Sequence, residues 1–175
     1  MAESRMVSHG IQLGYALPSD AQVLALMSRD LIETGLGWGY RHETILGFIA
    51  DPEVVVLAAR DHQQRVGFAV MKFGDERAHL VLLAILPAYQ RRGIARRTMA
   101  WLVESALTAG MMSIHVELRA DNQPAYALYR AIGFAETLRI PGYYQSRETA
   151  VRMIRMLRVP GFVAEEWRPP TLDKY

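Results

Sequence analysis

The apolar and polar positions in the first half of the chain predict one strand, two helices and then three strands. The trio Pro18-Ser19-Asp20 precedes apolar residues at helical spacing, so a helix follows the first strand. A second helix is expected to end at Asp51-Pro52. The three later apolar runs are separated by short polar turns, which is typical of an antiparallel meander. The expected elements are a strand at 11–17, a helix from 18–20 to about 31, a helix at about 41–49, and strands at 53–59, 66–73 and 78–86.

After Pro87 the apolar spacing changes from that of a strand to that of a helix. Apolar residues from 94 to 107 share one helical face, and Gly110 ends this helix. The remaining expected elements are a strand at 112–118, a helix at 124–132, a strand from 133 to about 140 and a strand at 150–157. The order is therefore β-α-α-β-β-β-α-β-α-β-β. The long helix connects two strands that should be parallel neighbours.

The expected fold class is a mixed α/β sheet, mostly antiparallel, with one parallel βαβ pair and helices on both faces. Residues 1–159 are expected to form a single domain. Residues 160–175 contain three prolines and Trp167, and we expect them to form an irregular C-terminal tail.

Composition restricts the class of protein. The chain has 175 residues, of which 51% are hydrophobic and 22% charged, as in an ordinary globular domain. Its longest apolar run, Leu80 to Leu86, is far shorter than the roughly 20 residues of a membrane-spanning helix. The first ten residues lack the apolar stretch of a signal peptide. We therefore expect a soluble, cytoplasmic protein with no membrane segment.

The residue types present also exclude several kinds of chemistry. There is no cysteine, so disulfides, thiolate catalysis and thiolate zinc sites are excluded. The five histidines are scattered without close metal-ligand pairing, and no metal site is expected. A net charge of +2 is too small to indicate a nucleic-acid partner. Arginine greatly outnumbers lysine, 18 against 2, which reflects either genome composition or phosphate recognition.

Residues 86–97, LPAYQRRGIARR, break a local rule. A strand ends and a helix begins near Gly93, where basic side chains oppose the positive end of the helix dipole. An anion bound at this turn would resolve the conflict, because the free N–H groups and the basic side chains would both face it. Gly93 and the small Ala95 would allow a phosphate to approach the backbone. The alternative is a solvated basic helix start. The basic side chains are those of Arg91, Arg92, Arg96 and Arg97.

Two segments resemble a known enzyme superfamily. Gln90–Ala95 resembles the Q/R-x-x-G-x-G/A signature of the GCN5-related N-acetyltransferases (GNAT). Residues 122–134 resemble the block N-x-x-A-x-x-x-Y-x-x-x-G-F of the same superfamily. The two matches have the right order and spacing, and the order of strands and helices fits from about residue 9 to 157. The resemblance implies a GNAT-type fold and acetyl-CoA as co-substrate.

The C-terminal part resembles one subgroup of that superfamily. Gly142-Tyr143-Tyr144, with residues 147–150 and Met153, is similar to the N-Y-Y…E-D-A…M ending of protein N-terminal acetyltransferases. The ribosomal-protein-alanine acetyltransferases are the most similar group. Gly142 stands where that group has Asn, and Thr149 where it has Asp. The N-terminal third, including residues 35–38, does not match that group.

The resemblance assigns a cofactor role to two parts of the chain. The pyrophosphate would lie on the turn that contains Arg91, Arg92, Gly93, Ile94, Ala95 and Arg96. The arm of the cofactor would follow Ile85 and Leu86, whose alternative role is core packing. Asn122 and Tyr129 correspond to positions that contact the arm and the sulfur. The alternative for Asn122 is a helix cap, and the alternative for Tyr129 is a core tyrosine bonded to a backbone carbonyl. As a general acid, the Tyr129 phenol would return a proton to the departing sulfur.

Candidate acceptor residues follow from the same comparison. An acceptor amine is mostly protonated near neutral pH, so a base must remove a proton before attack. Glu117 is the candidate, because residues 116–119 match the family's L-E-V-R. The alternatives are that Glu117 forms a structural ion pair with an arginine, or that His115 on the same strand face serves as the base. Tyr143 and Tyr144 either line the acceptor groove or are surface aromatics on a loop. Trp38, followed by Tyr40, is expected in a specificity loop.

These expectations combine into one functional hypothesis with rivals. The resemblance implies an acetyl-CoA-dependent N-acetyltransferase in which a primary amine attacks directly, through a tetrahedral intermediate. Backbone N–H groups near Leu86 would polarise the thioester carbonyl. The hypothesis for the acceptor is a protein N-terminal α-amine. The rivals are a small-molecule amine N-acetyltransferase, a non-catalytic acyl-CoA-binding module and, through the basic turn, nucleic-acid binding. Edge strands of this fold often pair, so a homodimer remains an open alternative.

Overall fold

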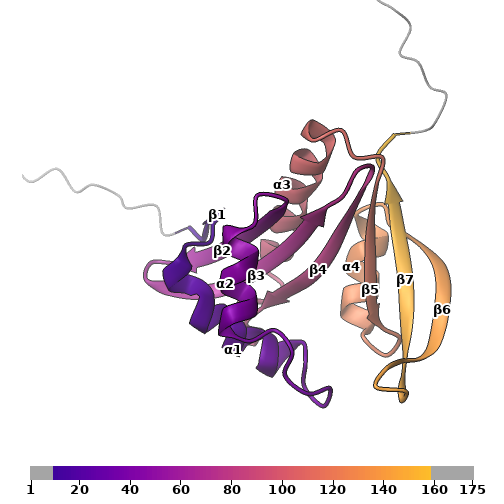
Figure 1. Cartoon of the computed structure of the whole chain (residues 1–175), viewed down its shortest axis with the longest axis horizontal. Coiled ribbons are helices and arrows are strands. Elements are labelled where there is room, and N and C mark those ends of the chain that lie inside the picture. Colours follow the sequence, from indigo (N-terminus) through magenta and orange to yellow (C-terminus); the bar gives the residue numbers. More distant parts are fainter. Residues whose placement is uncertain (1–9, 159–175) are drawn as a thin grey trace, which may run out of the picture.

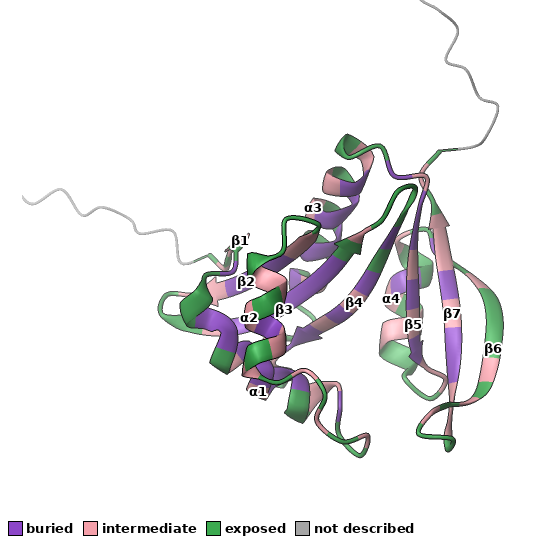
Figure 2. Ribbon diagram, in the orientation of Figure 1, coloured by how far each residue is buried: buried purple, intermediate pink, exposed green. Residues whose placement is uncertain are grey.

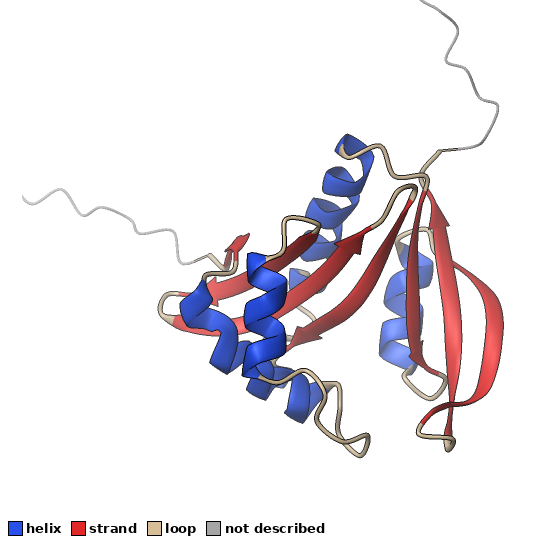
Figure 3. Cartoon of the chain, in the orientation of Figure 1, coloured by secondary structure: helices blue, strands red, loops and turns tan. Residues whose placement is uncertain are grey.

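A computed structural model of the chain describes residues 10–158, which form a mixed α/β structure around one sheet (Figure 1). The strands are β1 (Gln12–Tyr15), β2 (Val54–Asp61), β3 (Gln64–Phe73), β4 (Arg77–Ile85), β5 (Ser113–Arg119), β6 (Ala135–Tyr144) and β7 (Glu148–Met156). The helices are α1 (Ala21–Leu31), α2 (His42–Ala50), α3 (Ile94–Thr108) and α4 (Gln123–Ala131). Two short 3-10 turns lie at Pro18–Asp20 and Pro87–Tyr89. The predicted order of strands and helices is confirmed (Figure 3).

The sheet has the order β1-β2-β3-β4-β5-β7-β6 within the described residues. Strands β2, β3 and β4 form the predicted antiparallel meander. Strands β4 and β5 are parallel and are connected through α3, as the sequence predicts. All other neighbouring strands are antiparallel. The predicted fold class is therefore confirmed.

The helices cover both faces of the sheet, with a core layer on each side (Figures 1 and 2). On one face, α1 and α2 pack on β2–β4 through buried residues such as Leu24, Ile45 and Phe68. On the other face, α3 and α4 pack through Leu102 and Tyr129 among others. Among residues 10–158, no helix lies in front of β5 and β7 on the face that α1 and α2 cover elsewhere (Figure 1). None of the helices between residues 10 and 158 is long and apolar enough to cross a membrane.

A buried carboxylate ties the start of α1 to the sheet. The side chain of Asp20 is fully buried and accepts a hydrogen bond from the Leu17 N–H at 2.8 Å. It also accepts from Arg60 and Arg65, each at 2.6 Å. Burial on its own would raise the pKa of Asp20. The Leu17 N–H and the two guanidinium groups outweigh it, so this pKa lies below its usual value.

The parallel pairing of β4 and β5 is short, and this feature positions the site. The register pairs residues 77–80 of β4 with residues 113–116 of β5, and no residues beyond these are paired between the two strands in the described chain. The β3–β4 register also shifts between Val70 and Met71, where Val81 is left over as a bulge. Below the paired segment the two strands diverge (Figure 1). The divergence leaves one edge of β4 without a neighbouring strand.

The C-terminal hairpin differs in extent from the prediction. Strand β6 continues to Tyr144 and β7 begins at Glu148, although strands ending near 140 and beginning at 150 were expected. The Pro141-Gly142 pair resembles a turn in the sequence, but the chain turns only after Tyr144, where Gln145 and Ser146 have positive φ. Tyr143 and Tyr144 therefore lie on a strand and not on a loop. The predicted tail at 160–175 lies outside the described residues.

Candidate active site

The turn before α3 presents free backbone donors. Arg91 has φ +64° and Gly93 has φ +76°, and this left-handed backbone leads into the helix. The N–H groups of residues 91–96 donate to no acceptor among residues 10–158. The first N–H groups of a helix lack internal partners, so the turn concentrates unpaired donors at one point. This geometry suits an anion.

The four arginines of the turn do not share one environment. The Arg92 guanidinium lies over the Tyr89 ring at 4.9 Å, and Arg97 donates to the Ile11 carbonyl at 3.0 Å. Arg91 and Arg96 form no ion pair or side-chain hydrogen bond with any residue in the described part of the chain. Ile94 is buried in a small core cluster, against which Ala95 packs. Arg91 and Arg96 are thus available to a ligand, whereas Arg97 is engaged with the N-terminal strand.

The end of β4 does not have the geometry expected of it. Leu86 donates its N–H to the Val66 carbonyl at 2.8 Å, so this group is not free to polarise a thioester. The Ile85 side chain packs with Ile94, and its carbonyl accepts from the Gln90 side chain at 3.0 Å. The N–H of Leu86 itself is therefore engaged with β3, and the expectation that N–H groups near Leu86 face the reacting carbonyl stays a prediction for the neighbouring residues. The strand edge that is left unpaired lies further back, from Val81 onward.

A cavity of about 380 Å³ occupies the gap between the diverging β4 and β5. It is lined from both faces of the sheet. The α1–α2 side contributes residues 31, 32, 34 and 36, and the α4 side contributes Asp121, Asn122, Ala125 and Tyr129. Residues 80–83 of β4, residues 116–119 of β5 and Tyr144 complete the lining. The cavity therefore brings together Glu117, Asn122, Tyr129 and Tyr144, which the sequence analysis named separately.

Tyr129 reaches the cavity from α4. The residue is only 5% exposed, and its ring packs against Phe134 at 5.4 Å. No group among residues 10–158 forms a hydrogen bond with its hydroxyl, so the alternative of a core tyrosine bonded to a carbonyl is not what the structure shows. Burial raises the pKa of Tyr129, which keeps the phenol protonated around neutral pH.

Asn122 both caps helix α4 and lines the cavity. Its side-chain oxygen accepts from the Ala125 N–H at 3.2 Å, which confirms the reading as a helix cap. The residue also lines the cavity. The cap uses one oxygen, and the amide NH₂ of Asn122 has no partner among the described residues.

Glu117 lies on β5 in a network of hydrogen bonds. One carboxylate oxygen accepts from Arg152 at 2.9 Å, and the other lies 2.5 Å from the His79 Nε2. The hydrogen bond with His79 lowers the pKa of Glu117, with help from Arg152 and against the effect of burial. The predicted ion pair with an arginine is thus present, and it coexists with a place in the cavity wall.

His115 lies on the same strand face but has another partner. Its Nε2 is 2.9 Å from the Ser113 hydroxyl. Burial lowers the pKa of His115, and the charge of Arg77 acts in the same direction. His115 borders a second, open hollow that includes Arg77 and Arg152, and it does not line the cavity between β4 and β5.

The two tyrosines of the hairpin are not equivalent. Tyr144 lines the cavity, whereas Tyr143 is 46% exposed and meets Tyr144 edge to face at 4.9 Å. Burial raises the pKa of Tyr144 to about 12, and the charges of Tyr143 and Glu117 act in the same direction. Tyr144 is therefore the hairpin aromatic that faces the site.

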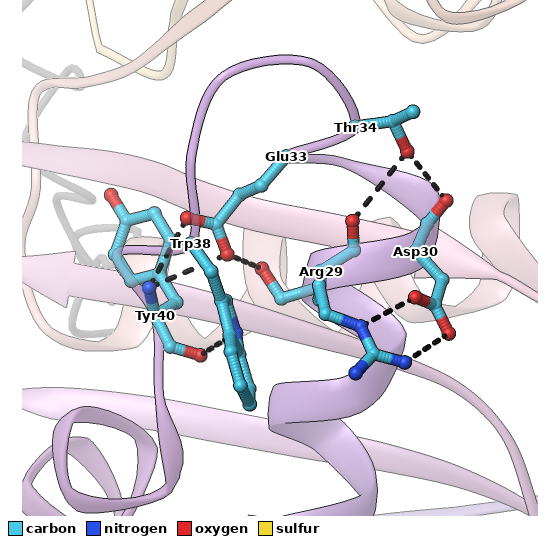
Figure 4. Close-up of polar contacts among 7 residues, drawn as sticks. Arg29, Asp30, Glu33, Thr34, Trp38 and Tyr40 are labelled. Atoms are coloured by element: carbon cyan, nitrogen blue, oxygen red, sulfur yellow. Dashed lines mark hydrogen bonds and ion pairs between the residues drawn. The ribbon is translucent and has the colours of Figure 1, made fainter.

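The loop between α1 and α2 is organised by Glu33 (Figure 4). This largely buried carboxylate accepts from the Ser28 hydroxyl at 2.9 Å and from the Gly39 and Tyr40 N–H groups at 2.6 and 3.2 Å. Trp38 donates its indole N–H to the Tyr40 carbonyl at 3.1 Å. The guanidinium groups of Arg29 and Arg41 lie over its ring, 5.4 and 5.5 Å from the centroid.

Trp38 consequently does not line the cavity, although the sequence analysis placed it in a specificity loop. Its hydrogen bond and the two guanidinium groups hold it within the loop itself. The loop reaches the cavity through Ile32, Thr34 and Leu36 instead.

Two contacts that the sequence did not indicate attach this loop to the sheet. Arg119 donates to the carbonyls of Ile32 and Thr34, at 3.1 and 2.7 Å, and pairs with Glu148 at 3.2 Å. Gln145, in the β6–β7 turn, donates to the Leu36 carbonyl. Both contacts join residues far apart in the chain, so no local sequence signal could have revealed them.

Comparisons with known proteins agree with this geometry. The family model described as the acetyltransferase (GNAT) family matches residues 23–134, which is more than half of the chain. Ribosomal protein bS18-alanine N-acetyltransferase from Salmonella typhimurium is 35% identical over 89 residues, which cover 49% of this chain and 60% of that protein. The chain thus matches about 60% of the length of this curated relative.

Two solved structures have the same fold. The ribosomal-protein-S18-alanine N-acetyltransferase from Escherichia coli superposes with a TM-score of 0.75 at 22% identity, covering 87% of this chain and 97% of that one. Arabidopsis thaliana NAA60 in complex with acetyl-CoA gives a TM-score of 0.75 at 19% identity and covers 85% of this chain and 99% of that one. Within residues 10–158, no group of three or more acidic or histidine side chains is placed to hold a metal ion. With the family model spanning most of its sheet and helices, the chain belongs to the acetyltransferase (GNAT) family.

Proposed function

We propose that this chain is an acetyl-CoA-dependent N-acetyltransferase whose acceptor is the α-amine of a polypeptide. The observation that carries the proposal is the cavity between β4 and β5, because its walls come from both faces of the sheet. Tyr129 lines the cavity from the α4 side of the sheet, and Glu117 lines it from strand β5. Two substrates can therefore meet there from opposite sides.

Acetyl-CoA fits the residues of the first face. The free N–H groups of residues 91–96 would hold its pyrophosphate, with Arg91 and Arg96 adding charge. The unpaired edge of β4 from Val81 onward would bind its arm and supply the N–H donors that polarise the carbonyl. When bound, acetyl-CoA supplies the acetyl group as a thioester. Asn122 would line the cavity beside the arm. The side chains of Ile85 and Leu86 would pack beneath the turn.

The residues around the cavity divide the proton transfers between them. Tyr129 holds a proton on its hydroxyl and is proposed as the donor to the departing sulfur. Glu117 provides the negative charge where the acceptor ammonium loses its proton. Tyr144 and the loop residues Thr34 and Leu36 would form the walls of the acceptor groove.

The acceptor class is supported by the relatives. The Salmonella protein, 35% identical over 89 residues, is named for acetylation of an alanine of a ribosomal protein. A small-molecule acceptor has no comparable support. The proposal therefore names a polypeptide N-terminus, and leaves its sequence to experiment.

The test is acetyl transfer from labelled acetyl-CoA into a degenerate peptide library that contains lysine. Half of the library has free N-termini and half has blocked N-termini. Label in the free half alone is the expected result, and the preferred sequences would identify targets. Equal label in both halves would indicate lysine acceptors. No label in either half, with coenzyme A binding intact, would overturn the polypeptide acceptor and favour small amines.

A further inference from the structure

The contact between Glu117 and His79 has no role in the function proposed above. His79 lies on β4 directly opposite His115 of β5, at the last part of the parallel pairing. Its Nε2 is 2.5 Å from one oxygen of Glu117, which is the shortest polar contact of that carboxylate. The Nδ1 of His79 forms no hydrogen bond with any residue in 10–158.

Glu117 by itself is a poor base in this setting. Its two oxygens already contact His79 and Arg152, and both contacts stabilise the carboxylate anion and lower its pKa. A general base works best when its own pKa is near the pH at which the enzyme operates. Imidazole meets this condition and a strongly stabilised carboxylate does not.

Exposure distinguishes the two members of the pair. The Glu117 side chain is 11% exposed and lines the cavity, whereas the His79 side chain is 46% exposed. A proton taken up near the cavity can therefore leave the protein through His79. The arrangement of a buried carboxylate bonded to one ring nitrogen, with the other nitrogen free, is that of a carboxylate–histidine dyad.

We propose that His79 and Glu117 act as one proton-accepting pair, in which Glu117 orients the imidazole and the proton of the acceptor ammonium ends on His79. This inference rests on the proposed function, because it concerns the acceptor amine of that reaction. It differs from the prediction that Glu117 alone is the base.

The proton balance of the step is simple. At the start, Nε2–H of neutral His79 donates to the Glu117 carboxylate. The ammonium gives one proton, through a water molecule, to the lone pair on Nδ1 of His79. The amine keeps the electron pair of that N–H bond and uses it to form the bond to the carbonyl carbon, while the C=O π pair moves to the oxygen. When that pair returns, the C–S bond breaks, the sulfur takes the Tyr129 proton, and the second proton of the nitrogen passes to the Tyr129 oxygen and restores the phenol. The imidazolium next to the Glu117 anion then releases the Nδ1 proton to bulk water.

Charged and titratable groups on four strands lie around His79. Lys72 is the register partner of His79 on β3, and Arg152 is bonded to Glu117 from β7. The titratable and charged groups that face His79 are Lys72 on β3, Arg77 on β4, His115 and Glu117 on β5, and Arg152 on β7.

The test compares single histidine-to-glutamine variants in the full chain, using a peptide that the wild type acetylates. His79→Gln should lower kcat by about 100-fold, the lower end of what a general base contributes, since water can replace it in part. It should also remove the acidic limb of the kcat–pH profile. The matched control is His62→Gln, in the β2–β3 turn, which should keep both the wild-type kcat and the limb.

Chemical rescue separates a proton-transfer role from a structural one. His79→Ala should regain at least tenfold in kcat when imidazole is added, while the KM for acetyl-CoA stays unchanged. Loss of the limb in His115→Gln instead, or kcat within threefold of wild type in His79→Gln, would overturn the proposal. Absence of rescue in a folded His79→Ala variant would also count against it. If the wild type acetylates no peptide, the proposed function has failed, and this outcome is distinct from the others.

Discussion

Removing the Tyr129 hydroxyl should separate activity from stability. The change Tyr129→Phe keeps the ring, which is packed against Phe134 at 5.4 Å and is 5% exposed. It deletes one hydroxyl that has no hydrogen-bond partner among the described residues. The hydroxyl borders the cavity and is not among the fully buried unpaired side-chain atoms of residues 10–158, so water there recovers part of the roughly 1–3 kcal/mol that a buried polar group without a partner costs. The free energy of unfolding should therefore stay the same or rise by up to about 2 kcal/mol.

The turnover number kcat of Tyr129→Phe should fall, although its stability does not. A general acid contributes about 10²–10⁴ in rate, which corresponds to about 3–5 kcal/mol of transition-state stabilisation. Tyr129→Phe should thus lower kcat by at least 100-fold, with little change in the KM for either substrate. Because burial raises the pKa of Tyr129, the wild type should show no loss of activity below pH 10 that is caused by this phenol.

The assay pairs urea denaturation with steady-state kinetics, and Tyr126→Phe is the matched control. Tyr126 lies one helical turn earlier on α4, and its hydroxyl donates to Glu136 at 2.9 Å. The control should lose about 0.5–1.5 kcal/mol of stability and keep kcat within twofold. The reasoning is refuted if Tyr129→Phe is destabilised by more than 1 kcal/mol, or if it turns over within twofold of the wild type.

Further predictions follow from the turn, the buried carboxylate and the loop anchor. Gly93→Ala should lower the free energy of unfolding by only about 1–2 kcal/mol in urea denaturation, because φ is +76° but an added Cβ meets no atom within 4 Å. Asp20→Asn should cost about 3 kcal/mol at neutral pH, since it leaves two guanidinium groups without their partner. The folded-state pKa of Asp20 is lowered, so its contribution is complete above the unfolded value of about 3.9 and disappears as the pH falls through the folded value. Urea denaturation of both proteins from pH 7 to pH 2 should therefore show the difference shrinking below about pH 4. Arg119→Lys, which cannot reach the carbonyls of Ile32 and Thr34 with the same forked donors, should raise the KM for the acceptor several-fold and leave that for acetyl-CoA unchanged in steady-state kinetics.

The order of elements was predictable because each element has a clear apolar period and a clear end. Helix α3 shows this, since its apolar residues share one face and glycines precede and follow it. The C-terminal hairpin shows the limit. Pro141-Gly142 reads as a turn, but the pairing of β6 with β7 shifts register there and continues to Tyr144. Tertiary pairing, and not local propensity, sets the end of that strand.

The candidate site was predictable where a local rule is broken, and not where contacts are long-range. The basic residues at the start of α3 conflict with the helix dipole, and this signal led to the turn at 91–96. The contact of His79 with Glu117 depends on the register of two parallel strands, which one sequence does not define. Trp38 lies in a Gly-rich loop that suggests specificity, but its side chain is occupied by contacts within the loop.

In each part of this site, groups that can form hydrogen bonds have no partner among the described residues. Among the described residues, the turn keeps the N–H groups of residues 91–96 unpaired, β4 is no longer paired with β5 after Leu80, and the Tyr129 hydroxyl has no partner. Each of these costs stability, because folding normally pairs such groups. The two core layers on either side of the sheet provide the compensating burial. A ligand with a phosphate end, an extended amide arm and a reactive sulfur would satisfy all three places at once. This agreement between three independent deficits and one molecule is the strongest physical argument that the cavity between β4 and β5 is built for acetyl-CoA.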